Sequence, residues 1–189
     1  KCLELAQGLT EKRIFRTLLL RPDDYLAALE KIPREEISMA YAAFGSYLWN
    51  ELLRRWLRAK INDLREVEAE SGTFLFWHRL DKPTLAQLRE LKLPTPAARM
   101  HFPDDFSRQL YCQLLADHNL NFSSFRTRAL SRVFFRSFER RVLLYPQDLQ
   151  VVSHGEDELH PGSKSLILSF SLPRGAFATM LIKRISLED

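Results

Sequence analysis

One aromatic residue near the C-terminus is set among small residues in a way that suits a flat ligand. Phe177 lies in the run Gly175-Ala176-Phe177-Ala178-Thr179, and Lys183 and Arg184 follow a short apolar stretch. Small neighbours let a planar base lie against the ring, and a nearby cation can hold a phosphate or a carboxylate. The alternative is a core strand, a turn and a short helix, which periodicity alone favours.

Arginine and phenylalanine are interleaved over residues 119–145, the most basic part of the chain. Such interleaving is typical of RNA contacts, which use charge, stacking and forked hydrogen bonds to phosphate. The alternative is an amphipathic helix or strand with a phenylalanine face and a solvated arginine face. That alternative explains any single arginine, but it explains the whole cluster less well. The candidate RNA-binding residues here are Arg126, Arg128, Arg132, Arg136, Arg140 and Arg141.

A second basic group ends the longest helical pattern, residues 34–60. Glu35 and Glu36 stand at its start and the cations at its end, which suits the helix dipole. These cations either contact phosphate or are simply solvated. We name Arg54, Arg55 and Arg58 as candidates for RNA binding, together with Arg174 beside the Gly175 turn.

The sequence lacks the motifs of several common enzyme classes. It contains no G-x-G-x-x-G, Walker A, H-E-x-x-H, C-x-x-C or nucleophile-elbow pattern. Cys2 and Cys112 have no metal-binding spacing and are expected to be free thiols in a reducing cytoplasm. The pairs Asp23-Asp24 and Asp104-Asp105 stand where helix caps are expected, so we interpret them as structural. We predict neither a metal site nor an organic cofactor.

Composition indicates an ordinary globular chain. Of its 189 residues 46% are apolar and 28% charged, with a formal net charge of +4. This length allows one core, or one core and a smaller lobe. No apolar run approaches the roughly 20 residues of a membrane span.

Local patterns place these candidate residues on alternating helices and strands. Asp23 or Asp24 is predicted to cap one helix and Thr84 another, residues 147–163 are predicted as a hairpin connection, and Gly175 as a sharp turn. The expected helices are 1–20 (broken near Gly8), 25–33, 34–60, 84–91, 103–118 and a short one after Gly175, and the expected strands are 64–67, 73–77 and 165–172.

Three stretches resemble the TruD-type tRNA pseudouridine synthases. Leu172-Pro173-x-Gly175-x-Phe177-Ala178-Thr179 resembles the family's C-terminal motif, with Ala176 in place of Ser, Lys183 in place of Arg and Arg184 in place of Glu. Because Lys offers a point charge, a bidentate contact at Lys183 is not expected. Two further stretches are similar to family patterns: residues 42–50 (AAFGSYLWN) and residues 140–146 (RRVLLYP).

The resemblance implies an α+β fold: part of the mixed-sheet catalytic domain of a pseudouridine synthase, with an inserted helix-rich α/β TRUD domain. Residues 1–33 and 142–189 would belong to the catalytic domain, and residues 34–141 to the insertion. Phe177 and Lys183 would lie in the catalytic site, with the ring of Phe177 against the target uracil. The implied partner is tRNA, modified at the uridine of position thirteen without metal or cofactor, by a cytoplasmic monomer.

The family's catalytic Asp lies in a motif of the kind G-x-K-D-x-x-A-x-T-x-Q, which this sequence lacks. Because the chain opens in the middle of a helical pattern without Met, we expect a fragment that is inactive by itself. Two other functions remain open. One is a non-catalytic RNA-binding module that holds RNA through Arg126 to Arg141. The other is a protein-interaction domain with a basic surface.

Overall fold

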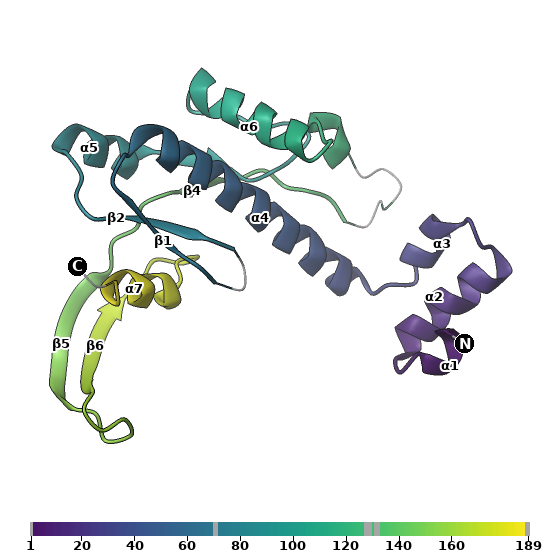
Figure 1. Cartoon of the computed structure of the whole chain (residues 1–189). Coiled ribbons are helices and arrows are strands. Elements are labelled where there is room, and N and C mark those ends of the chain that lie inside the picture. The colour runs from purple at the N-terminus through teal and green to yellow at the C-terminus, as the bar shows by residue number, and fades with distance from the viewer. Residues whose placement is uncertain (1, 70–71, 127–129, 131–132, 188–189) are drawn as a thin grey trace. The chain divides into compact units, whose positions relative to one another are not determined.

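The computed structural model describes residues 2–69, 72–126, 130 and 133–187 (Figure 1). The chain divides into two compact units, one formed by residues 1–60 and 92–140 and the other by residues 61–91 and 141–189. Both units contain helices and strands, so the predicted α+β class is confirmed. Within the described ranges, no helix has both the length and the apolar character that crossing a membrane requires.

The first unit is built on the long helix α4 (Arg34–Lys60). Leu48, Leu52 and Trp56 follow each other at intervals of four residues and are completely buried. Helix α6 (Asp105–Asp117) packs along α4 and buries Tyr111, Leu114 and Leu115, as Figure 1 shows. Two apolar helix faces therefore supply most of this unit's core.

Two short strands complete this unit beside α4. β3 (Lys92–Pro94) pairs with β4 (Glu139–Arg141). Thr95 continues the connection, because its amide donates to the Phe138 carbonyl at 2.9 Å. Its hydroxyl donates to the Arg136 carbonyl and accepts from the Phe138 amide, both at 3.0 Å. One buried threonine thus fixes the backbone that leads into β4.

Three helices precede α4 among the described residues, and side-chain carboxylates hold the starts of the second and the third. They are α1 (Cys2–Leu5), α2 (Leu9–Leu20) and α3 (Tyr25–Leu29). The Glu11 carboxylate accepts from the Gln7 and Gly8 amides ahead of α2. The Asp24 carboxylate accepts from the Ala27 amide at 3.0 Å, which confirms one of the two predicted caps of α3.

In its described part, the second unit contains two antiparallel strand pairs and two helices. β1 (Leu64–Val67) and β2 (Phe74–Trp77) are predicted strands, and the structure pairs them. β6 (Lys164–Ser171) is the predicted strand before Pro173, and α7 (Ala178–Ile185) is the short helix expected after Gly175. Gly175 has a φ of 86°, a conformation that glycine adopts at little cost, so the predicted turn is confirmed.

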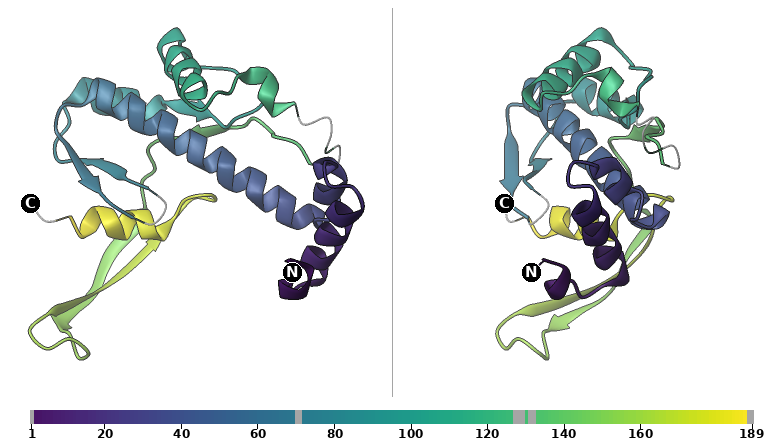
Figure 2. Two further views of the ribbon diagram at one scale, coloured as in Figure 1. Left: turned by 45° about the vertical axis from the view of Figure 1, so that its right-hand side comes forward. Right: turned by 90° about the vertical axis from the view of Figure 1, so that its right-hand side faces the viewer.

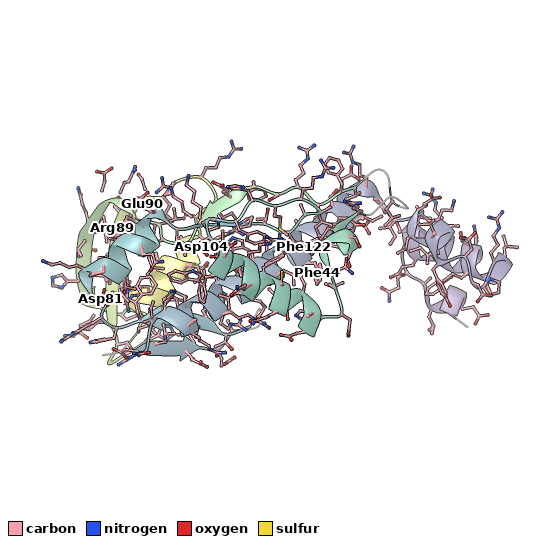
Figure 3. The ribbon with its side chains drawn as sticks, turned by 90° about the horizontal axis from the view of Figure 1, so that it is seen from above. Phe44, Asp81, Arg89, Glu90, Asp104 and Phe122 are labelled. Atoms are coloured by element: carbon pink, nitrogen blue, oxygen red, sulfur yellow. The ribbon has the colours of Figure 1, made fainter. Side chains whose placement is uncertain are left out.

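The start of α5 (Lys82–Glu90) differs from the prediction. Asp81, and not Thr84, caps the helix: its carboxylate accepts from the Thr84 amide at 2.7 Å and from the Thr84 hydroxyl at 3.0 Å. Pro83 suits a first helical turn because it needs no amide partner there, so the helix begins ahead of Thr84. These hydrogen bonds hold the pKa of Asp81 below its usual value, and the bond from the Thr84 amide has the larger effect. Figure 3 labels Asp81 at this end of α5.

The prediction for residues 147–163 is wrong in part. Residues Gln147–Glu156 form the strand β5, and only the segment between Glu156 and Lys164 is a connection. β5 pairs antiparallel with β6, and Figure 2 shows the two as a long ribbon. Every residue of β5 is exposed, so the strand needs no alternation of apolar and polar residues. Its hydrogen-bonded pairing with β6 is what makes this segment a strand.

The basic segment 119–145 is mostly irregular in its described part. Its regular pieces there are the 3₁₀ helix η1 (Phe122–Phe125) and β4. The amphipathic helix or strand considered above is therefore not what these described residues form.

We predict that Leu52→Ala lowers the free energy of unfolding by about 2–5 kcal/mol, because it leaves a cavity in a fully buried position. Met39→Ala is the matched control, since Met39 lies on the same helix and is 72% exposed. The control should change stability by less than about 0.5 kcal/mol. Urea unfolding of the two variants measures both values. Equal losses would contradict the assignment of Leu52 to the core.

Candidate nucleic-acid interface

The stretch around Phe177 has the geometry of a strand, a turn and a helix start. Phe177 is the residue before the first turn of α7, in an extended conformation with φ −119° and ψ 120°. Its carbonyl accepts from the Met180 amide at 3.0 Å, which begins the helix. The side chain is 62% exposed, so within this chain the ring is open to a ligand and is not part of a core.

Lys183 lies in the last turn of α7, whereas Phe177 is the extended residue ahead of its first turn. Its ammonium lies 5.9 Å from the centre of the Phe74 ring, a weak cation–π contact within the same unit. Arg184 follows Lys183 in the same last turn.

The arginines of α4 are engaged inside the chain. The Arg54 guanidinium pairs with Glu51 at 2.5 Å, and its side chain is only 18% exposed. The Arg55 guanidinium pairs with Asp117 of α6 at 2.6 Å. Arg58 is exposed and also takes part in an interaction with the chain. Carboxylates thus offset the charges of Arg54 and Arg55, which weakens their attraction for phosphate.

The phenylalanines of the basic segment divide into two groups. Phe135 stacks on Tyr41 with ring centres 4.5 Å apart, and Phe125 meets Phe135 edge to face at 5.1 Å. These rings anchor the segment to α4. Phe134 and Phe138, by contrast, are 54% and 60% exposed. The segment therefore presents aromatic surface as well as charge to the solvent.

The described arginines of this segment have few carboxylate partners. Arg126 and Arg136 are exposed, and the Arg136 guanidinium lies 4.7 Å from the centre of the Phe134 ring. Arg141 is exposed and donates to the Arg89 carbonyl at 3.4 Å. Arg174, in the turn before Phe177, is exposed as well. The predicted candidates Arg128 and Arg132 lie outside the described residues.

Arg140 is the most constrained of these cations. Its guanidinium lies 4.5 Å above the Trp49 ring, and Trp49 itself is held by a hydrogen bond from its indole nitrogen to the Leu93 carbonyl. Partial burial lowers the pKa of the Arg140 guanidinium, because desolvation disfavours its charged form. A carboxylate would offset this effect, and none among the described residues pairs with it.

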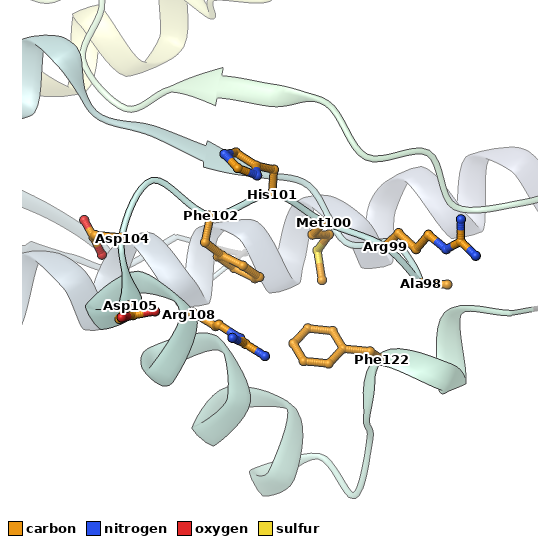
Figure 4. Close-up of a pocket in the computed structure, with 9 residues that line it drawn as sticks. All are labelled: Ala98, Arg99, Met100, His101, Phe102, Asp104, Asp105, Arg108 and Phe122. Carbon is orange, nitrogen blue, oxygen red and sulfur yellow. The ribbon is translucent and has the colours of Figure 1, made fainter.

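A pocket of about 580 Å³ opens beside the start of α6, at a place that no sequence motif singled out. Figure 4 shows Phe102, Met100 and Phe122 around its middle, with Arg108 extending from α6 toward Phe122. Phe102 and Phe122 both contact the buried ring of Tyr111, at 5.6 and 6.2 Å between centres. The signal that could have revealed it is the same mixture of arginine and aromatic residues, here divided between residues 98–108 and Phe122.

No group of three or more His, Cys, Asp or Glu in the described ranges is placed to hold a metal ion. Exposed cations and aromatic rings of the kind described above suit a polyanion with flat bases.

Comparison with known sequences identifies relatives. Residues 4–185 match the family model described as tRNA pseudouridine synthase D (TruD). The probable tRNA pseudouridine synthase D 2 of Methanocaldococcus jannaschii is 30% identical over 168 residues, covering 88% of this chain and 39% of the relative. The tRNA pseudouridine synthase D of Leptospira interrogans is 27% identical over 200 residues, covering 100% of this chain and 48% of the relative. The chain thus spans less than half of the length of these two curated relatives.

A solved structure shares the fold. The crystal structure of a Methanosarcina mazei protein titled as tRNA pseudouridine synthase D matches with a TM-score of 0.67 and 22% identity. The match covers 93% of this chain and 44% of that one. At this identity the likeness concerns the fold alone, and it shows that the mixed α+β arrangement resembles part of that structure.

We predict that stability falls as the pH rises above about 10, the ordinary pKa of tyrosine. Tyr111 is fully buried, and this burial raises the pKa of its phenol. The folded chain then holds a proton that the unfolded chain releases, so alkaline pH favours unfolding. The Tyr111 hydroxyl also has no hydrogen-bond partner in the described part of the chain.

The test compares Tyr111→Phe with Tyr25→Phe, an exposed control, by urea unfolding at neutral and alkaline pH. Tyr111→Phe should flatten the alkaline loss and raise stability at neutral pH by about 1 kcal/mol, because it removes an unsatisfied buried group. The same alkaline loss in both variants would contradict this role of Tyr111.

Proposed function

The chain belongs to the tRNA pseudouridine synthase D (TruD) family, and we propose that it supplies the RNA-holding surface and the base-stacking wall of a tRNA pseudouridine synthase. The reaction would isomerise a uridine of tRNA, at position thirteen by resemblance, to pseudouridine. The catalytic Asp motif, which this sequence lacks, would act on the uridine from the remainder of the family fold.

The observation that carries this proposal is the exposed ring of Phe177 in a matching motif. Pro173, Gly175, Ala178 and Thr179 surround it as in the family pattern, and the ring is 62% exposed at the start of α7. A base that leaves its stack loses stacking energy, and an aromatic face replaces part of it, worth about 1–3 kcal/mol per base. Phe177 would offer that face to the target uracil.

The exposed arginines would hold the RNA backbone. Arg126, Arg136 and Arg174 have no ion pair among the described residues, and Arg141 donates only to a backbone carbonyl. The positive charges of these guanidiniums are therefore available to phosphate, whereas those of Arg54 and Arg55 are already paired with carboxylates. We therefore place phosphate contacts on the basic segment, with Arg128 and Arg132 as its further members, and give α4 a smaller part. Lys183 would contribute a single charge near the site.

The proposal also assigns the parts of the chain to two domains of the family. Residues 34–141 would be the inserted domain that grips tRNA, and residues 1–33 and 142–189 would belong to the catalytic domain. The compact units have other limits, since residues 61–91 group with residues 141–189. A second candidate function is an RNA-binding module without turnover, which the lack of the Asp motif in these 189 residues favours.

We predict that the chain binds a tRNA transcript with an affinity that falls steeply as salt rises, since binding to phosphates releases counterions. Arg126→Gln/Arg136→Gln should weaken binding and reduce the slope of log K against log salt by about 0.9 for each phosphate that is no longer neutralised. The matched control is Arg13→Gln/Arg16→Gln on α2, which removes two exposed charges elsewhere. Fluorescence anisotropy at several salt concentrations measures both pairs. Identical behaviour of the two would show that the basic segment is only a solvated face.

We also predict that Phe177→Ala weakens binding of a single-stranded, uridine-containing RNA about 5- to 100-fold, whereas Phe177→Tyr retains affinity because its ring still stacks. Because Phe177 is largely exposed, Phe177→Ala should leave the free energy of unfolding within about 0.5 kcal/mol. Anisotropy and urea unfolding provide the two readouts. A large loss of stability with unchanged RNA affinity would assign Phe177 to packing instead.

A further inference from the structure

We propose that the pocket beside the start of α6 is a second base-binding site, which takes an unstacked guanine nucleotide of the RNA. It is made of other residues than those around Phe177. The proposal rests on the proposed function, because it assumes that the chain holds RNA. The pocket lies wholly within the first unit, between residues 98 and 122.

The middle of the pocket offers aromatic faces for stacking. Phe102 and Phe122 meet edge to face with ring centres 6.3 Å apart, which leaves no space for a base between them. A base can instead lie on one ring and touch the edge of the other, with Met100 beside it. Tyr111, completely buried behind both rings, holds them in place. A volume of about 580 Å³ falls within the range of small-ligand pockets and accommodates a nucleotide.

The acidic and basic residues of the pocket lie at different places along it. In Figure 4, Asp104 and Asp105 lie at one end and Arg99 at the other, with Arg108 between them. Both guanidiniums are exposed and have no hydrogen bond or ion pair among the described residues. Two arginines and two aspartates carry no net charge, so the pocket does not suit a bare phosphate. It suits a ligand with an anionic end and a hydrogen-bond-donating end.

The acidic end indicates which base fits. The Asp104 carboxylate already accepts from the Ser107 amide at 2.6 Å as the cap of α6. Asp105 is exposed, and no hydrogen bond to its carboxylate is found among the described residues. Guanine presents two neighbouring donors, N1–H and the exocyclic amine, which a carboxylate accepts together. Uracil has no amine, so this site would discriminate against the base that Phe177 is proposed to hold.

The test uses the full 189-residue chain and short single-stranded RNAs that are identical except for one position, occupied by guanosine, inosine or uridine. Inosine lacks only the exocyclic amine. We expect the guanosine RNA to bind about tenfold more tightly than the other two, measured by anisotropy at one salt concentration. Asp105→Asn should abolish this preference, and Arg108→Gln should weaken all three RNAs to a similar extent.

Asp63→Asn is the matched control for Asp105, because Asp63 is an exposed aspartate of the other unit. Circular dichroism of each variant shows that it is folded. A parallel titration with free guanosine and uridine 5′-monophosphates distinguishes an RNA strand from a free nucleotide as the source of the ligand.

The outcomes separate this proposal from the proposed function. Salt-dependent RNA binding without a guanosine preference, or a preference that Asp105→Asn leaves unchanged, would overturn the second site and leave the RNA-holding function standing. Binding of guanosine monophosphate that Asp105→Asn removes, without RNA binding, would show a guanine site for a free nucleotide and overturn both RNA as its ligand and the RNA-holding function. Binding of neither would overturn both.

Discussion

The first unit depends on one side chain that joins three elements. Trp49 belongs to α4, and its indole nitrogen donates to the Leu93 carbonyl of β3. Its ring forms a cation–π contact with the Arg140 guanidinium of β4. Its side chain is almost fully buried, so the hydrogen bond satisfies a polar group that would otherwise be unpaired. The strand pair is thereby held to the long helix, and the irregular part of the basic segment has a fixed endpoint at β4.

That endpoint matters because the basic segment has little regular structure to hold it. In its described part, aromatic contacts take the place of a hydrogen-bonded ladder. Phe125 and Phe135 pack with Tyr41 of α4, and the Thr95 hydroxyl bridges the Arg136 and Phe138 backbone groups. A segment held at intervals in this way can follow an irregular ligand more closely than a straight helix could. Its exposed arginines and phenylalanines lie between the points of attachment.

Charge compensation divides the arginines into two classes that their sequence positions do not reveal. Arg54 and Arg55 have carboxylate partners within the chain, and Arg55 links α4 to α6 through Asp117. Arg99, Arg108, Arg126 and Arg136 have no such partner among the described residues. An exposed guanidinium that forms no internal ion pair loses less when it binds phosphate, since no existing contact must be broken. These four arginines lie between residues 99 and 136, whereas Arg54 and Arg55 belong to the last turns of α4.

The sequence by itself determined the local elements with strong periodicity and the identity of the family. The apolar stripe of residues 34–60, the strand before Pro173 and the Gly175 turn are local properties, because they follow from side-chain spacing and from backbone freedom at single residues. Long-range contacts decided the rest. β5 is a strand because β6 pairs with it, and Asp117 neutralises an arginine 62 residues away in the chain. The pocket beside α6 likewise requires Phe122 to approach Phe102, and no local pattern encodes that approach.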